Sequence, residues 1–416
     1  MKDFFLEIYG EEIPPNSQIN GENELKKSLE TFFQEKKIEF SEIVTYSTSR
    51  RFIIIIKNVS KLAESENLEI RGPRIEANEK AISGFMKSNN VKTKNELQVK
   101  KIKDVKYFFI LKKSKPDKVE DLLESNLNNI LASIKWKKSM RWSSFDERWI
   151  RPIRNILCMF GSKKILFSYA SVNSKDFSFG NYQLDNKKIK FIDTSKYLKF
   201  LKQNFVLVDR NERMEIVKKK LLDFCNKKRL KKDFDENQIR RVSDTVEYPN
   251  VYIGTFDKSY FKIPEFLLKS IISEKQDFFY FQKKDDQLIN YFAFISNKKS
   301  DNKKKLIVGN ENVLKARFSD AIFFLEEDKK VSFQQRLELL KGIVFYENVG
   351  SLYDRSIRIK EITQIISQKL NFDLNDDIKN NLQFSNVDLT TELVKEFPTL
   401  QGKVGGFYAS LAGFKT

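Results

Sequence analysis

The sequence contains no histidine among its 416 residues. Without an imidazole there is no Ser-His-Asp or Cys-His nucleophile, no HExxH zinc site and no His-Asp metal phosphohydrolase centre. The two commonest nucleotide-binding loops, GxxxxGK[ST] and GxGxxG, are also missing. Carboxylate, lysine or tyrosine chemistry remains open, and so does binding without chemistry. Histidine-dependent catalysis is therefore excluded, and we expect no metal site in this chain.

Cysteine and long apolar runs are scarce as well. Cys158 and Cys225 are too few for a disulfide scaffold or a zinc-thiolate site, which fits a reducing compartment. The longest apolar run, Phe52 to Ile56, has the length of a strand and is far too short to span a membrane. The first residues become acidic too early for a signal peptide. We expect a soluble, cytoplasmic protein with no membrane partner.

The charge is strongly one-sided, with 76 Lys+Arg against 57 Asp+Glu and a formal net charge of +19. A polyanion partner explains such a balance, because basic side chains release counterions when they meet phosphates. Compositional drift explains it equally well, since the chain is rich in Lys, Asn, Ile and Phe and its lysines are spread throughout. Local clusters must therefore decide between the two.

Hydrophobic periodicity predicts an α+β fold. Asp3 to Ile8 and Phe52 to Ile56 have strand patterns, and the second is apolar enough to be buried on both faces. Helical stripes comprise Leu25, Leu29, Phe32 and Phe33, and then the apolar positions from Val119 to Ile134. Further patterns indicate a strand over 107–111, helices over 81–86 and 212–224, and a hairpin over 278–296.

From Lys329 onward the pattern is helical only, with one stripe at Leu337, Leu340 and Val344 and another at Ile359, Ile362, Ile366 and Leu370. The length predicts two or three domains. We expect a mixed α/β body made of residues 1–165 and 166–330, followed by an all-α domain over residues 331–416.

The segment Lys135 to Arg154 is the clearest candidate for nucleic-acid binding. All three tryptophans of the chain lie in it, interleaved with lysines and arginines. Cationic groups neutralise phosphates and Trp stacks on unpaired bases. The alternative is that the tryptophans pack in the core beneath snorkelling basic side chains, and the two interpretations are compatible.

A second basic cluster, Ser49-Arg50-Arg51, precedes the buried strand and is expected at a sheet edge or loop tip. It is either a phosphate clamp or an ordinary solvated pair. The candidate phosphate contacts are Arg50, Arg51, Lys137, Lys138, Arg141, Arg151 and Arg154, with Trp142 as a candidate stacking residue.

Acidic residues gather between Glu311 and Asp328. Carboxylates of this kind bind Mg²⁺, but more often they form salt bridges on a surface helix. We favour the structural interpretation.

Several stretches together resemble the beta subunit of the bacterial two-subunit glycyl-tRNA synthetase. The strongest are Met140-Arg141-Trp142 with Trp149-Ile150-Arg151-Pro152-Ile153-Arg154, and Gly309-Asn310-Glu311-Asn312-Val313-Leu314-Lys315-Ala316-Arg317-Phe318-Ser319-Asp320-Ala321. The others, collinear over the whole chain, are Phe5 to Pro15, Thr48 to Phe52, Arg71-Gly72-Pro73, Gly350 to Asp354, Asp388 to Val394 and Glu396 to Gly402.

This resemblance implies a specific division of labour. A partner alpha subunit carries the class II active site, where ATP and glycine form glycyl-adenylate. The beta subunit binds and positions tRNA(Gly) within an α2β2 heterotetramer. It implies that this chain holds no cofactor itself, with ATP and Mg²⁺ bound at the alpha-subunit active site.

The resemblance also has departures. The region from about Val331 is similar to the start of the family's HD-like helical domain, which would be incomplete here, and the C-terminal anticodon-binding domain is expected to be absent. Two stretches where relatives often carry histidine read Gly180-Asn181-Tyr182-Gln183 and Lys275-Gln276. A stand-alone or remnant RNA-binding protein without aminoacylation activity therefore stays open as an alternative.

Overall fold

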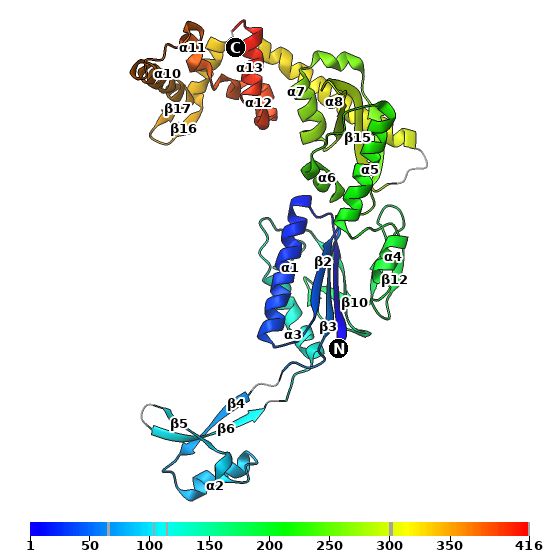
Figure 1. Ribbon diagram of the computed structural model, residues 1–416, viewed down its shortest axis with the longest axis vertical. Coiled ribbons are helices and arrows are strands. Elements are labelled where there is room, and N and C mark those ends of the chain that lie inside the picture. Colours follow the sequence, from blue (N-terminus) through cyan, green and yellow to red (C-terminus); the bar gives the residue numbers. More distant parts are fainter. Residues whose placement is uncertain (65–66, 103–104, 114, 299–302, 415–416) are drawn as a thin grey trace. The chain divides into compact units, whose positions relative to one another are not determined.

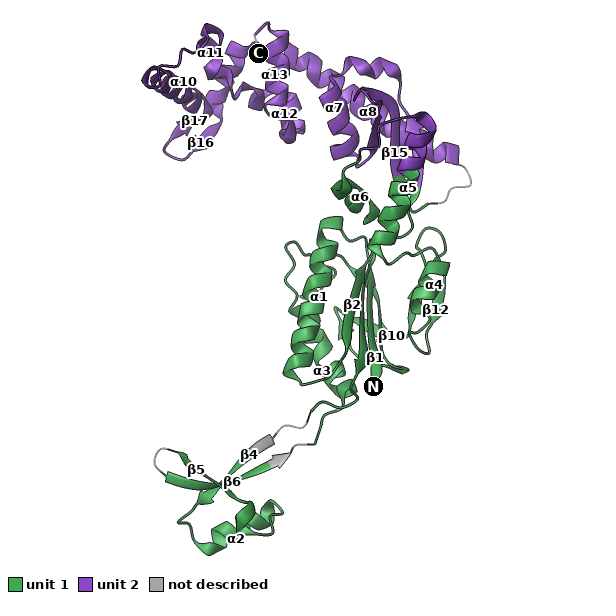
Figure 2. Cartoon of the chain, viewed as in Figure 1, with its two compact units in different colours: residues 1–220, 234–250, 295–299 green, residues 221–233, 251–294, 300–416 purple. Residues whose placement is uncertain are grey.

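The computed structural model describes residues 1–64, 67–102, 105–113, 115–298 and 303–414. They form two compact units (Figures 1 and 2). Unit 1 comprises Met1–Lys220, Phe234–Asn250 and Ile295–Lys299, and unit 2 comprises Leu221–Asp233, Val251–Phe294 and Ser300–Thr416. This division differs from the expected segments 1–165, 166–330 and 331–416, because segments distant in sequence return to the same unit.

The elements up to residue 243 are β1 (Lys2–Gly10), α1 (Pro15–Glu35), β2 (Glu42–Ser47), β3 (Arg51–Val59), β4 (Asn67–Arg74), α2 (Glu79–Ser88), η1 (Lys94–Glu96), β5 (Gln98–Ile102), β6 (Val105–Lys113), α3 (Val119–Ala132), β7 (Ile153–Phe160), β8 (Lys163–Lys164), β9 (Ser168–Tyr169), β10 (Val172–Lys175), β11 (Phe177–Phe179), β12 (Lys188–Lys190), α4 (Tyr197–Gln203), α5 (Arg210–Lys228) and α6 (Glu236–Ser243).

The remaining elements are β13 (Asn250–Thr255), η2 (Lys258–Lys262), α7 (Glu265–Ser270), η3 (Ile271–Lys275), β14 (Phe279–Gln282), β15 (Leu288–Ser296), α8 (Lys303–Lys329), α9 (Phe333–Leu339), η4 (Leu340–Gly342), β16 (Val344–Tyr346), β17 (Gly350–Ser351), α10 (Leu352–Lys369), α11 (Asp376–Asn381), η5 (Leu382–Phe384), η6 (Val387–Thr390), α12 (Glu392–Glu396), η7 (Pro398–Leu400) and α13 (Lys403–Leu411). The α+β class is confirmed. No helix within the described ranges is both long and apolar enough to cross a membrane.

The main sheet of unit 1 has the strand order β2-β3-β1-β7-β10-β9, with β8 pairing on β7. β1 lies antiparallel between β3 and β7, with Leu6 opposite Ile54 on one side and Cys158 on the other. The pair formed by β7 and β10 is parallel. Three neighbouring apolar strands, β3, β1 and β7, therefore form the centre of the sheet.

Both faces of this sheet are covered, as the run Phe52 to Ile56 predicts. Alternation along the strands sends Leu6 and Ile54 to one face and Phe5 and Ile55 to the other. The first face packs against α1 and α3, and the second against α4 (Figure 1). The predicted α1 stripe of Leu25, Leu29, Phe32 and Phe33 is fully buried.

A smaller antiparallel sheet, β4-β6-β5, packs with α2 around its own core of Ile82, Leu97 and Ile110. Here Gly72 meets the ring of Phe85, where a Cβ would lie 2.4 Å from Cε1. The matched stretch Arg71-Gly72-Pro73 is thus a close-packed β4 segment.

Unit 2 combines the sheet β13-β15-β14 with the helices α7, α8, α12 and α13. The hairpin predicted over 278–296 is confirmed as β14 and β15. Along α8 the buried side chains Leu314, Phe318, Ala321 and Leu325 face the core.

The expectation of purely helical structure over residues 331–416 is wrong in one place. β16 and β17 form a small hairpin there, and Val344, placed on a helical stripe by its spacing, is a strand residue that is 75% exposed. Ile362 and Ile366 of α10, and Leu370 directly after the helix, are also at least half exposed. The stripe is therefore helical as predicted up to Ile366, but the described residues do not cover it.

Candidate nucleic-acid interface

One end of the main sheet brings several basic residues together. β1 ends at Gly10, next to the beginnings of β3 and β7, because its two neighbours run antiparallel to it. The Gly10 N–H donates to the Arg50 carbonyl over 2.9 Å, and the Glu11 N–H donates to the Pro152 carbonyl over 3.0 Å. Arg50 and the segment from Arg151 to Arg154, about 100 residues apart in sequence, thus meet at this end of the sheet.

A cleft of about 940 Å³ lies beside it. One wall is the start of α1, and the other is formed by the segment 135–140 with Ile150 and Arg151. The cations in the lining are Lys135, Lys137, Lys138 and Arg151, against a single carboxylate, Glu24. Within the described ranges none of these four cations makes an ion pair, so the cleft carries a surplus of uncompensated positive charge.

Tryptophan packing holds the basic wall in place. Met140 and Trp149 exchange backbone hydrogen bonds of 2.9 and 3.2 Å, which close the 140–149 segment into a loop. Trp149 is buried, and its ring contacts Trp136 edge-on at 4.8 Å between centroids and Tyr169 at 5.7 Å. The core-packing interpretation is therefore confirmed for Trp149.

The other two tryptophans are only partly buried. Trp142 packs against the same core and Trp136 lines the cleft. The Trp136 Nε1–H is buried without an acceptor, which leaves a donor unsatisfied in a residue that lines the cleft. Lys137, Lys138, Arg141, Arg151 and Arg154 are exposed, as a role in binding requires.

Glycine lets α1 approach this wall closely. A Cβ on Gly21 would lie 2.5 Å from Cζ of Phe52 and 2.9 Å from Cη2 of Trp136, so no larger residue fits without displacement.

The α1 wall was missed by sequence reasoning. It presents Asn16, Asn20 and Asn23 to the cleft, together with Ser17. Their spacing of four and three residues places the asparagines on one helical face, and this signal was present in the sequence. Amide groups both donate and accept hydrogen bonds, which suits polar base edges as well as phosphates.

Arg50 and Arg154 share one carboxylate. Arg50 Nη2 lies 3.1 Å and Arg154 Nη2 2.6 Å from the Glu11 carboxylate. Burial raises the pKa of Glu11, but hydrogen bonding from Arg154 and the charges of Arg50 and Arg154 outweigh it and hold the pKa below its usual value. The Arg50 guanidinium also stacks on Tyr182 at 4.6 Å from the ring centroid. Two cations on one carboxylate leave this group of three side chains with a formal charge of +1.

The sequence matches the family model described as glycyl-tRNA synthetase beta subunit over residues 4–416. The chain belongs to this family.

Curated relatives agree with this assignment. The chain is 33% identical over 409 residues to the glycine–tRNA ligase beta subunit of Rickettsia bellii (strain OSU 85-389), a match that covers 98% of this chain and 61% of the relative. Identity to the protein of the same name from Rickettsia felis is 32% over 415 residues, and to that from Rickettsia prowazekii 32% over 409. The chain thus spans about three fifths of the length of these relatives. The resemblance to the beta subunit is confirmed.

Within the family stretch Thr48 to Phe52, Arg51 does not have the role expected from sequence. Its side chain is 0% exposed, so the expectation of a phosphate contact is wrong for this conformation. It donates from Nε to Glu247 at 2.8 Å and from Nη1 to Glu7 at 2.6 Å and Ser178 at 3.1 Å. Its Nη2 donates to the Gly180 carbonyl over 2.9 Å. Burial opposes the charge, but Glu247 and Glu7 raise the Arg51 pKa well above its ordinary value.

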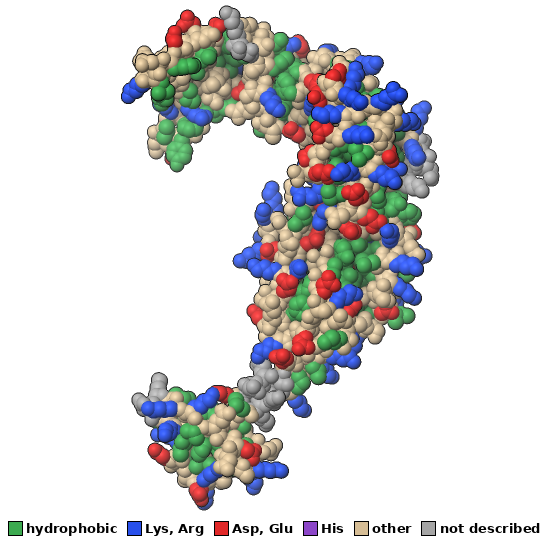
Figure 3. Space-filling view, in the orientation of Figure 1, with side chains coloured by type: hydrophobic (Ala, Val, Ile, Leu, Met, Phe, Trp, Pro, Cys, Tyr) green, Lys and Arg blue, Asp and Glu red, His purple; other side chains and the backbone are tan. Residues whose placement is uncertain are grey.

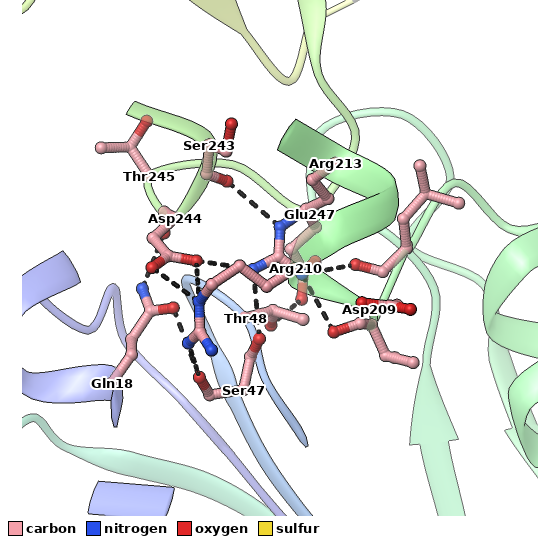
Figure 4. Close-up of polar contacts among 12 residues, drawn as sticks. Gln18, Ser47, Thr48, Asp209, Arg210, Arg213, Ser243, Asp244, Thr245 and Glu247 are labelled. Carbon is pink, nitrogen blue, oxygen red and sulfur yellow. Dashed lines mark hydrogen bonds and ion pairs between the residues drawn. The ribbon is translucent and has the colours of Figure 1, made fainter. Parts of the chain in front are cut away.

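A second buried network anchors the α1 wall (Figure 4). Asp244 receives Arg210 Nε at 2.9 Å and Arg213 Nη2 at 2.8 Å, and its carbonyl receives Gln18 Nε2 at 2.7 Å. Arg210 also reaches Glu22 of α1 at 2.7 Å. Because Gln18 and Glu22 lie on the same helix as the cleft asparagines, this network fixes the wall relative to α5 and α6.

Burial lowers the pKa of both arginines in this network, but the net shifts of the two differ in sign. Burial lowers the pKa of Arg213, whereas for Arg210 the lowering by burial is outweighed by Glu22 and Asp244, and its pKa is raised. Sequence reasoning missed both networks, because a charged residue gives no local signal of a partner some 200 positions away.

The acidic stretch of unit 2 has the structural role that we favoured. Glu311 accepts a hydrogen bond from the Thr255 N–H over 2.8 Å. Asp328 is buried, pairs with Arg336 at 3.1 Å and accepts from the Glu392 N–H at 2.9 Å. Among the described residues, no group of three or more His, Cys, Asp or Glu side chains is placed to hold a metal ion.

Proposed function

We propose that this chain is the tRNA-binding beta subunit of a glycine–tRNA ligase. It binds and positions tRNA(Gly) for ATP-dependent glycylation at the active site of an alpha subunit. The observation that carries the proposal is the cleft between α1 and the segment 135–151, in a chain that belongs to the beta-subunit family. The four cations of the cleft make no ion pair with any carboxylate among the described residues.

The chemistry of the cleft is that of RNA binding. Lys137, Lys138 and Arg151 neutralise phosphates, which sets the affinity and its dependence on salt. Arg154 and Arg141, together with the half-buried Trp142, extend the basic surface beyond the cleft, whereas Arg50 is buried beside Glu11 and offers phosphates no exposed contact. The asparagines of α1 add hydrogen-bonding groups to the opposite wall. Membership of the beta-subunit family supports the assignment of adenylate formation to the alpha subunit.

The proposal includes the partners and cofactors of the whole enzyme. The chain assembles with the alpha subunit as α2β2 and holds no cofactor of its own, and ATP and Mg²⁺ bind at the alpha-subunit site. We place the complex in the cytoplasm, where tRNA is charged.

Glycine charging tests the proposal directly. Purified alpha subunit is assayed for transfer of glycine to tRNA(Gly), alone, with this chain, and with its Lys137→Glu/Lys138→Glu variant. The control is Lys219→Glu/Lys220→Glu, an equally exposed adjacent pair on α5 within unit 1.

We expect charging only when both subunits are present, a lower rate with the cleft variant, mainly through a higher KM for tRNA, and no change with the control. If charging is absent while this chain still binds tRNA and no complex with the alpha subunit forms, the stand-alone RNA-binding function replaces the proposed one.

A further inference from the structure

A second basic groove lies in unit 2, apart from the cleft described above. It has a volume of about 770 Å³ and is formed by three elements: the end of α5, the turn η2, and the hairpin of β14 and β15. Its lining contains the cations Lys228, Arg229, Lys258, Lys283 and Lys284. Figure 3 shows Lys and Arg side chains gathered over this region of unit 2.

The charge of the groove is uncompensated. Asp285 is the only carboxylate among the described residues of the lining, which leaves a formal balance of +4 among them. The C-terminal end of α5 contributes about half a negative charge, which does not alter the sign. In the described part of the chain, none of the five cations forms an ion pair. Lys283 donates only to the neutral amide of Gln287, over 2.5 Å.

Two carboxylates close in sequence to lining residues, Asp233 and Asp286, share one cation outside the lining, so this group keeps one formal negative charge against the +4 of the lining. Lys231 bridges Asp286 at 2.6 Å and Asp233 at 3.2 Å. These carboxylates therefore do not pair with the groove cations, whose positive charge remains available to an anionic ligand in the groove.

The groove is also built rigidly. The Lys231 N–H donates to the Gln282 carbonyl over 3.0 Å, which ties the end of α5 to the hairpin. Asn290 Nδ2 donates to the Phe256 carbonyl over 2.9 Å, and Phe256 packs on Phe261 at 5.6 Å, which ties the hairpin to η2. Arg229 has a left-handed φ of 57°, so the helix ends there and the chain turns away.

Aromatic rings lie between the cations. Tyr291 is half-buried, contacts Phe224 at 5.5 Å, and lies 5.3 Å from Lys228 Nζ. Phe261 is 40% exposed on the η2 side. Cations distributed around exposed rings are the arrangement by which proteins bind unpaired nucleotides, with phosphates on the rim and bases stacked on the rings.

We infer that this groove is a second RNA-binding site, which takes an unpaired segment of the RNA strand with its phosphates on the five cations and a base against Tyr291 or Phe261. The inference rests on the proposed function in that the RNA is the tRNA bound by this chain. RNA fits better than a single small anion because the cations belong to three separate elements and so match successive phosphates.

The test compares charge reversals on two walls with a matched control. Lys283→Glu/Lys284→Glu alters the hairpin wall and Lys258→Glu the η2 wall. Lys369→Glu/Lys403→Glu changes the same charge at exposed positions of unit 2 outside the groove. Affinity for tRNA(Gly) and for a short oligouridylate is measured by fluorescence anisotropy over a range of salt concentrations, after circular dichroism has shown that each variant is folded.

We expect each groove variant to bind tRNA and oligouridylate more weakly than the control. For the hairpin pair the loss is about tenfold or more at low salt, and the salt slope falls by roughly 1–2. Ultraviolet crosslinking of oligouridylate to the wild type, read by mass spectrometry, should label the peptide that contains Tyr291.

The outcomes separate the two proposals. If the wild type binds tRNA and the groove variants equal the control, the groove inference is overturned and the proposed function stands. If tRNA does not bind but oligouridylate binding still depends on Lys283 and Lys284, the proposed function fails and the inference is overturned for tRNA, while the groove is shown to be a site for another unpaired RNA strand. If ATP alone binds as tightly as oligouridylate and is lost with the same variants, the groove is a small-nucleotide pocket and the inference is overturned.

Discussion

Replacing Arg51 by methionine should destabilise unit 1 strongly and affect RNA only through folding. The substitution keeps much of the side-chain volume but removes four hydrogen bonds, two of them to the carboxylates of Glu7 and Glu247, which are 0% and 1% exposed. Removing one partner of a buried ion pair costs about 3–5 kcal/mol, because the remaining charge is left uncompensated. With a urea slope near the upper end of the usual ~1–3 kcal/mol/M, the unfolding midpoint falls by about 1–2 M.

Tryptophan fluorescence in urea measures this effect selectively. All three tryptophans belong to unit 1, so their emission reports the unfolding of that unit. The control is Arg141→Met, since the Arg141–Asp146 pair is exposed and is worth about 1 kcal/mol at most. The triple variant Arg51→Met/Glu7→Gln/Glu247→Gln should be more stable than Arg51→Met, because it also removes the stranded charges.

The opposite result would refute this reasoning. If Arg51→Met leaves the urea midpoint unchanged and weakens tRNA binding, Arg51 contacts phosphate after all, as its place in the sequence first indicated.

Three further predictions concern packing, thiol reactivity and acid stability. Gly21→Ala should lower the free energy of unfolding by about 1–3 kcal/mol, because its Cβ would overlap Phe52 and Trp136. The control Gly309→Ala on α8, where a Cβ has no neighbour within contact distance, should not destabilise the chain. Equal effects of the two substitutions on the urea midpoint would contradict this prediction. Burial raises the pKa of Cys225 to about 11 and that of Cys158 well above its ordinary value. Neither thiol should therefore react with iodoacetamide at pH 8 until urea unfolds the chain. Rapid labelling of the native protein would contradict this prediction. Although burial raises the pKa of Glu11, Arg154 and Arg50 lower it overall, so its stabilising contribution is present at neutral pH and is lost as the pH falls through the lowered pKa. Glu11→Gln should therefore lose less stability on acidification than the wild type. Parallel profiles of stability against pH for the two proteins would contradict the pairing.

Local periodicity was sufficient to predict much of the fold. The α1 stripe from Leu25 to Phe33, the two-sided strand from Phe52 to Ile56 and the hairpin of β14 and β15 all follow from spacing. The same patterns do not predict which other elements pack against each helix or strand. Val344 fits a helical stripe but is an exposed strand residue, and Ile362 and Ile366 form a helical stripe that the described residues leave uncovered.

The candidate site was predictable where exposure follows from a local cluster and unpredictable where it depends on distant partners. Lys137, Lys138 and Arg151 line the cleft as their cluster indicated. Arg50 and Arg51 are neighbours at the start of a strand, where successive side chains point to opposite faces. Both are buried, and their distant partners Glu11 and Glu247, 39 and 196 residues away in sequence, explain this burial.

The most direct test of the central claim is the salt dependence of tRNA(Gly) binding to the wild type, to Lys137→Glu/Lys138→Glu and to the control Lys219→Glu/Lys220→Glu. If the cleft binds the phosphate backbone, the cleft variant loses affinity and its slope of log K against log salt falls by about 2, whereas the control retains the wild-type slope. If both variants keep the wild-type affinity and slope, the cleft between α1 and the segment 135–151 is not where this chain meets tRNA.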